Sequence, residues 1–185
     1  MTSIDSKEAA SALSDISEIA RRVRQSTIYS LSSRVLIMWG ALTFAGYIQS
    51  YVSPRHAGYG WIAVYVAGIL GTIVISAFNR IRSGIGTFNI RMFAAFLLFI
   101  AVGMFSSVWL GHFTPRQMGT FWPLYFMMVY TIVGLWVGFA FVAIGLGIIA
   151  LTLIGYFLVG DAFDLWMAFV NGGGLIVGGL WMRRS

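Results

Sequence analysis

Long apolar segments follow one another from Val35 to Met182, and this feature constrains the fold of the chain most. A helix needs about 20 mainly apolar residues to cross the roughly 30 Å of hydrocarbon in a bilayer. Only 10% of the residues are charged, against about 25% in ordinary soluble domains. The sequence therefore predicts an all-α integral membrane protein with six transmembrane helices, near residues 35–52, 61–78, 92–111, 120–139, 142–160 and 164–182.

The basic residues fall on alternate connections between these spans. Lys and Arg that flank spans are retained on the cytoplasmic side. If the N-terminus is inside, only Arg55 and Arg116 lie outside, so both termini, with the basic tail 183–185, are predicted to be cytoplasmic in a bacterial inner membrane. The scattered charge argues against a nucleic-acid partner and places the inner basic residues near anionic lipid headgroups. They are Lys7, Arg21, Arg22, Arg24, Arg34, Arg80, Arg82, Arg91, Arg183 and Arg184.

Residues 1–34 are the only sizeable polar segment and are predicted to form a cytoplasmic amphipathic helix with a basic juxtamembrane end. Acidic residues precede basic ones, which suits the helix dipole. The helix either lies on the headgroups or under its own bundle, or it docks a second copy or another protein. Its narrow apolar face comprises Leu13, Ile16, Ala20 and Val23, and its acidic residues are Asp5, Glu8, Asp15 and Glu18.

An internal match predicts that the bundle consists of three repeated helical hairpins. Residues 41–47 (ALTFAGY) and 150–156 (ALTLIGY) agree at five of seven positions. This layout resembles that of the HdeD-like acid-resistance membrane proteins, whose hairpins turn near a proline, as Pro54 and Pro115 do in the first two hairpins here. The third hairpin turns at 161–164 without a proline, and the resemblance implies a hairpin arrangement but no functional residue.

Small residues predict where helices pack closely. Gly134, Gly138 and Gly145 share one stripe if the fourth span runs on, and Gly174 with Gly178 forms a second pair. The connection 138–145 has no charge and no strong turn signal, so a buried tight turn or a re-entrant segment also fits there.

The run Asn171, Gly172, Gly173 and Gly174 lies in the middle of the sixth span. It either kinks a packed helix or breaks it beside a polar path. If it only kinks the helix, alanine at Gly172 or Gly173 should be neutral or stabilising.

Catalytic chemistry is weakly represented, and no catalytic residue or cofactor is predicted. The span cores lack charged residues and histidine, which argues against a proton relay. The chain has no cysteine, and its only lysine, Lys7, lies outside the spans. One cluster of polar residues remains in the external loops. If these loops converge, the cluster is expected to bind a divalent cation or to sense pH; otherwise its residues are solvated. No particular metal is indicated. The cluster comprises His56, His112, Arg116, Asp161 and Asp164.

These features favour a non-enzymatic membrane interaction or stress-response protein. A small transporter or channel subunit for a neutral or weakly polar solute is the alternative, with its path beside Asn171. An integral-membrane enzyme would require catalysis by the external cluster.

Overall fold

The computed structural model describes residues 6–83 and 90–184. Asp5 and Ser185, which belong to the predicted N-terminal helix and basic tail, lie outside these residues. Every regular element in the described ranges is helical. The elements are α1 (Ser6–Val52), the 3-10 helix η1 (Pro54–His56), α2 (Ala57–Ser83), α3 (Ile90–Met104), the π-helix η2 (Phe105–Leu110), α4 (Pro115–Val137), α5 (Phe139–Leu158), α6 (Phe163–Met167), the π-helix η3 (Ala168–Gly173) and α7 (Gly174–Met182).

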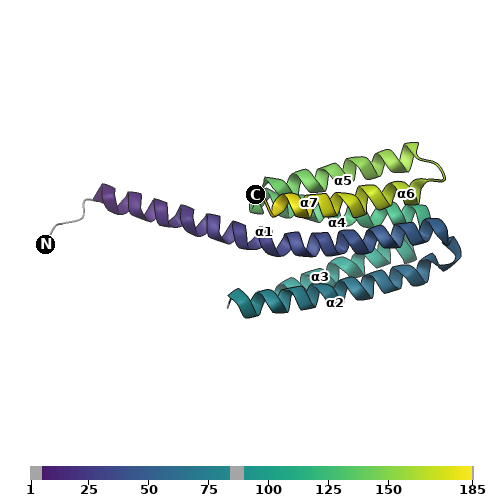
Figure 1. Cartoon of the computed structure of the whole chain (residues 1–185), viewed down its shortest axis with the longest axis horizontal. Helices are drawn as coiled ribbons and strands as arrows, with labels where there is room; N and C mark the ends of the chain where they lie inside the picture. The colour runs from purple at the N-terminus through teal and green to yellow at the C-terminus, as the bar shows by residue number, and fades with distance from the viewer. Residues whose placement is uncertain (1–5, 84–89, 185) are drawn as a thin grey trace.

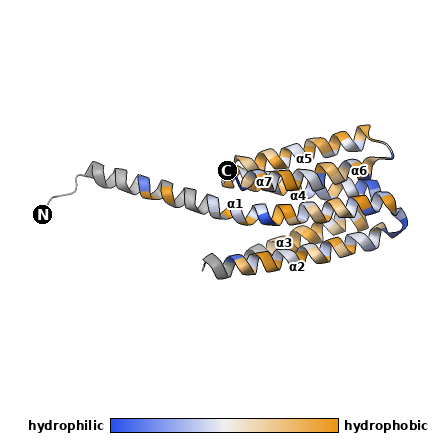
Figure 2. Ribbon diagram, viewed as in Figure 1, coloured by the Kyte–Doolittle hydropathy of each residue, from blue (hydrophilic) through white to orange (hydrophobic). Residues whose placement is uncertain are grey.

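Five helical segments of the described chain are long and apolar enough to cross a bilayer, as expected for a helical membrane protein. The third predicted span corresponds to a shorter apolar helix, Ala94–Leu110, so the predicted count of six is not confirmed. Many large apolar side chains are exposed, such as Leu70, Trp136 and Phe157. Most of the ribbon is apolar, with hydrophilic residues at the end where α1 turns into α2 and at separate positions along α1 (Figure 2). The five segments are Ile28–Val52, Pro54–Asn79, Pro115–Val137, Phe139–Leu158 and Phe163–Met182.

The connections at 53–56, 111–114 and 159–162 lie at one end of the bundle, which we call the turn end (Figure 1). The C-terminus lies at the opposite end, the terminal end, where α1 also extends beyond the other helices. This arrangement follows from antiparallel neighbours joined by short turns. Helix α1 runs without interruption from Ser6 to Val52, so the expected boundary at residue 34 is not a break in the backbone.

Helix α1 packs against the C-terminal segment through very small residues. A Cβ at Gly172 would lie 2.6 Å from the Cβ of Phe44 and 2.7 Å from its Cα. A Cβ at Gly40 would lie 2.7 Å from the carbonyl oxygen of Gly172. Nearer the terminal end, the Ser33 hydroxyl donates to the Gly179 carbonyl at 2.7 Å. The absence of side chains therefore lets the two backbones approach directly.

The chain reverses its direction between α4 and α5 at a single residue, Gly138. This residue has φ 156° and ψ 158°, a conformation that only glycine adopts readily. Its N–H donates to the Gly134 carbonyl at 2.9 Å. A Cβ at Gly134 would lie 2.7 Å from the Cβ of Phe141, and one at Gly145 would collide with Thr131. The expected stripe is thus divided, because Gly138 makes the turn while Gly134 and Gly145 pack the two helices together.

The second glycine pair lies between α7 and α5. A Cβ at Gly174 would lie 3.2 Å from Ile148, and one at Gly178 would lie 2.8 Å from Ile144. These contacts join the apolar core that α5 shares with α1, α4 and α7. Its buried members are Tyr29, Leu36, Met127, Ala140, Phe141, Ile144, Ile148, Val170, Leu175 and Met182.

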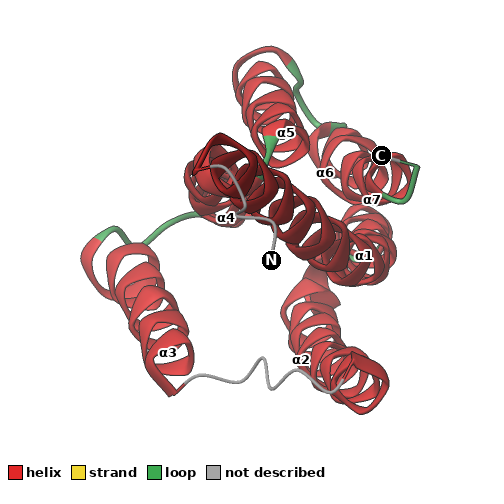
Figure 3. Ribbon diagram, turned by 90° about the vertical axis from the view of Figure 1, so that its left-hand side faces the viewer, coloured by secondary structure: helices red, strands yellow, loops and turns green. Residues whose placement is uncertain are grey.

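Helices α2 and α3 lie on different sides of the bundle, as the end-on view shows (Figure 3). Helix α2 packs on α1, where the Trp39 indole donates to Thr72 at 3.0 Å. Helix α3 meets α4 through stacked rings of Phe99 and Tyr125, whose centroids are 4.0 Å apart. The two matched heptapeptides also make similar contacts, since Gly46 faces Trp61 and Gly155 faces Trp166.

The glycines of η3 differ in their surroundings, and this yields a stability prediction. Nothing lies within 4 Å of a Cβ at Gly173, whereas one at Gly172 meets the α1 backbone. We expect Gly172→Ala to destabilise the protein by about 1–3 kcal/mol because of overpacking. Gly173→Ala should be neutral or stabilising by up to ~1 kcal/mol. Thermal unfolding in detergent measures both variants, and equal melting temperatures would contradict the close contact.

Candidate functional site

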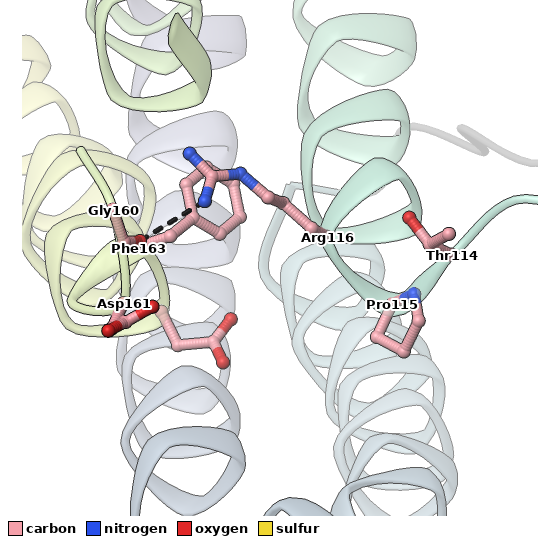
Figure 4. A pocket seen from close by; sticks show the side chains of 7 residues that line it. Thr114, Pro115, Arg116, Gly160, Asp161 and Phe163 are labelled. Carbon is pink, nitrogen blue, oxygen red and sulfur yellow. Dashed lines mark hydrogen bonds between the residues drawn. The ribbon is translucent and has the colours of Figure 1, made fainter. Parts of the chain in front are cut away.

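A cavity of about 330 Å³ lies at the turn end, between the first turn of α4 and the connection from α5 to α6. Arg116 reaches across from α4 toward Gly160 and Phe163, and Asp161 lies below them on the same side (Figure 4). Three members of the predicted external cluster, Arg116, Asp161 and Asp164, therefore meet at this cavity. Its full lining is Thr114, Pro115, Arg116, Gly160, Asp161, Phe163 and Asp164.

The Arg116 guanidinium binds the C-terminal end of α5. Nη1 donates to the Gly160 carbonyl at 3.1 Å, and Nη2 donates to the carbonyls of Tyr156 at 2.8 Å and Val159. Carbonyls at a helix C-terminus lack intrahelical donors and carry the negative end of the dipole, so a cation is favourable there. The guanidinium carbon also lies 4.9 Å from the centroid of the Phe163 ring, within cation–π range. Arg116 thus connects the start of α4 with the end of α5 and the start of α6.

Thr114 fixes the first turn of α4 by a capping box. Its hydroxyl accepts from the Gln117 N–H at 3.3 Å, and the Gln117 side chain accepts from the Thr114 N–H at 2.9 Å. Pro115 occupies the first helical position, where a missing N–H costs nothing. Thr114 is not among the residues predicted for the cluster, although Thr-Pro-Arg-Gln has the spacing of a helix start.

Neither aspartate forms a direct ion pair within the described part of the chain, although Asp164 interacts electrostatically with Arg116. Asp161 is exposed in the turn after α5, and Asp164 is half-buried in the first turn of α6. The nearby cation, Arg116, directs its hydrogen bonds to backbone carbonyls instead. The residues that line the cavity include no nucleophile paired with a base.

The histidines of the predicted cluster stay in their own turns. Nδ1 of His56 lies 3.1 Å from the Ser53 hydroxyl, and His112 has a left-handed backbone with φ 44°. Neither lines the cavity. Among the described residues, no group of three or more His, Asp or Glu lies close enough together to hold a metal ion.

Asn171, from the predicted polar path, is buried in η3 beside the side chain of Tyr47. The Tyr47 hydroxyl donates to the Gly119 carbonyl at 2.7 Å. These residues link η3, α1 and α4 through buried polar groups. In the sequence Tyr47 is marked only as part of a repeat, because its hydrogen-bond partner, a backbone carbonyl, leaves no signal in the sequence.

Removing the Arg116 side chain should loosen the turn end. We expect Arg116→Ala to destabilise the protein by about 1.5–3 kcal/mol, since charged hydrogen bonds to carbonyls are lost. Arg116→Lys should restore little, because a single ammonium cannot reproduce the planar fork. Arg55→Ala, at an exposed arginine of the same end, is the control and should change stability by less than ~0.5 kcal/mol. Equal unfolding temperatures for the two alanine variants would contradict the assigned role.

No family model, no curated protein and no solved structure matches this chain.

Proposed function

We propose that this protein is a non-enzymatic membrane interaction protein, whose bundle anchors a projecting helix that pairs with a second copy of the chain. One observation carries the proposal. Helix α1 is continuous from Ser6 to Val52, but only its part from Ile28 onward is a candidate span. Residues 6–27 correspond to about 33 Å of helix at 1.5 Å per residue, and the N-terminal part of α1 extends beyond the other helices (Figure 1).

The course of α1 supports docking over the two alternative positions of the N-terminal segment. A helix that lies on the headgroups or under its own bundle must bend where it leaves the span. No interruption of α1 occurs between Ser6 and Val52. The side chains of Ile16 and Ile19 are 63% and 62% exposed, which leaves apolar surface outside the predicted bilayer.

A second copy is the partner that suits this geometry best. Two copies in one membrane project their helices in parallel from the same side. Residues 13, 16, 20 and 23 then repeat at the three- and four-residue steps of a short coiled-coil seam. A stress-response role would use this seam as the point of regulated assembly.

The topology within this proposal has six spans in three hairpins, with both termini in the cytoplasm of a bacterial cell and the inner arginines at anionic headgroups. Helices α3 and η2 follow each other directly from Ile90 to Leu110, about 31 Å of helix, which is enough for a sixth span. The clustering of the connections at the turn end also supports an even number of crossings.

The transporter alternative has weaker support. It requires space beside Asn171, and η3 is a π-helix, a geometry that is frequent at functional sites. However, the direct approach of Gly172 to Phe44 favours close packing of this segment over a path through it.

The docking proposal is tested by cross-linking, which is simple because the natural chain has no cysteine. Ile16→Cys, on the seam, should give a covalent dimer upon oxidation of membranes. Asp15→Cys, at the next residue on a different face, is the matched control and should cross-link several-fold less. Equal yields at both positions, or none at either, would refute the seam.

The topology is tested with single cysteines and a membrane-impermeant maleimide. Gly58→Cys and His112→Cys, both at exposed positions of the turn end, should be labelled in intact cells. Arg184→Cys should be labelled only after permeabilisation. Labelling of position 184 in intact cells would overturn the six-span arrangement.

A further inference from the structure

Helix α4 contains a buried proline, Pro123, in its interior. Proline has no backbone N–H, so the carbonyl of the residue four positions earlier, Gly119, loses its usual helical donor. The proline ring also crowds that carbonyl and weakens the helix at this point. A backbone carbonyl without a donor is costly within a membrane, where no water replaces the missing bond. The Gly119 carbonyl therefore needs a donor from another helix.

Helix α1 supplies that donor. The Tyr47 hydroxyl donates to the Gly119 carbonyl at 2.7 Å, and the Tyr47 side chain is only 2% exposed. The Tyr47 ring packs edge-on against Trp61 of α2, with ring centroids 4.9 Å apart, and it lies beside Asn171 of η3. These neighbours hold the hydroxyl against the carbonyl that Pro123 leaves without an intrahelical donor.

The missing bond divides α4 into a turn-end part, residues 115–122, and a longer part that ends at Val137. The turn-end part carries Arg116, whose guanidinium binds carbonyls of α5. The longer part packs closely on α5 through Gly134. Helices bend at prolines, and the glycine at position 119 adds backbone freedom in the same turn. Without the bond to Tyr47, the turn-end part is therefore able to bend relative to the rest of α4.

We propose that residues 119–123 form a hinge in α4 and that the Tyr47 hydroxyl of α1 locks it. Loss of the hydrogen bond lets the turn-end part of α4, with Arg116, move away from α1. A hydrogen bond weakens steeply as its geometry departs from the optimum, so a small displacement of α1 is enough to open the lock. The arrangement of the turn end thus depends on the position of α1. This lock lies within the bundle and does not depend on the proposed docking of the projecting helix.

A double-mutant cycle, measured by thermal unfolding of the full-length protein in detergent, tests the lock. Tyr47→Phe removes only the hydroxyl and should lower the unfolding temperature by about 4 °C or more, because a buried carbonyl loses its partner. Pro123→Ala restores the backbone N–H, so in that background Tyr47→Phe should cause less than about half of this shift. Equal shifts in the two backgrounds would overturn the proposal.

Tyr125→Phe is the matched control. The Tyr125 hydroxyl of α4 also donates to a helical carbonyl, that of Phe99 in α3, at 3.1 Å. Phe99 lies inside α3 four residues before Gly103, whose N–H is the regular helical donor to this carbonyl. Tyr125→Phe should therefore lower the unfolding temperature less than Tyr47→Phe does. A shift of the same size from both variants would count against a specific lock at Tyr47.

A pair of spin labels reports the hinge directly, and labelling is simple because the natural chain has no cysteine. The labels are placed on Val52→Cys, at the end of α1, and on Met118→Cys, in the turn-end part of α4. Pulsed electron paramagnetic resonance should give a broader or longer distance distribution in the Tyr47→Phe variant than with Tyr47 in place. Adding Pro123→Ala should restore the narrow distribution. An unchanged distribution in Tyr47→Phe would refute the hinge, whatever the stability of Pro123→Ala.

Discussion

Direct backbone contact between α1 and the C-terminal segment is the interaction on which the rest of the bundle depends. Gly40, Gly172 and Gly179 remove the side chains that would separate these helices, and a Cβ at Gly179 would lie 2.9 Å from the Ser33 carbonyl oxygen. Helices in lipid gain little from apolar burial against each other, so packing and hydrogen bonds must hold them. Because α2 packs on α1, a loss of this contact would detach the first hairpin, α1 and α2, from the core.

The positions of the helices were largely predictable from sequence, because bilayer thickness imposes a minimum length on each apolar segment. The reversal between α4 and α5 was not, since its conformation depends on Gly138 alone and no charge or proline marks it. The effect of an alanine at Gly172 could not be predicted from sequence either. The free-energy cost of a glycine in a helix follows from the residue itself, but the contact of Gly172 with Phe44 joins residues that are far apart in the chain.

The candidate site was predictable only in part. Loops that follow alternate spans must meet at one end of a bundle, and Arg116, Asp161 and Asp164 line one cavity there. This rule could not separate them from His56 and His112, because loop proximity says nothing about side-chain direction. Nor could it show that Arg116 binds backbone carbonyls, since every residue has a carbonyl and only the fold determines which ones lack a donor.

The one-residue reversal at Gly138 has a consequence for how the chain enters the membrane. The residues beside it are apolar and largely exposed, with Trp136 at 80% and Phe139 at 75%. A connection without charge gives the insertion machinery nothing to retain on the cytoplasmic side. Helices α4 and α5 are therefore expected to partition into lipid together, as one preassembled hairpin whose orientation is dictated by its flanking sequences.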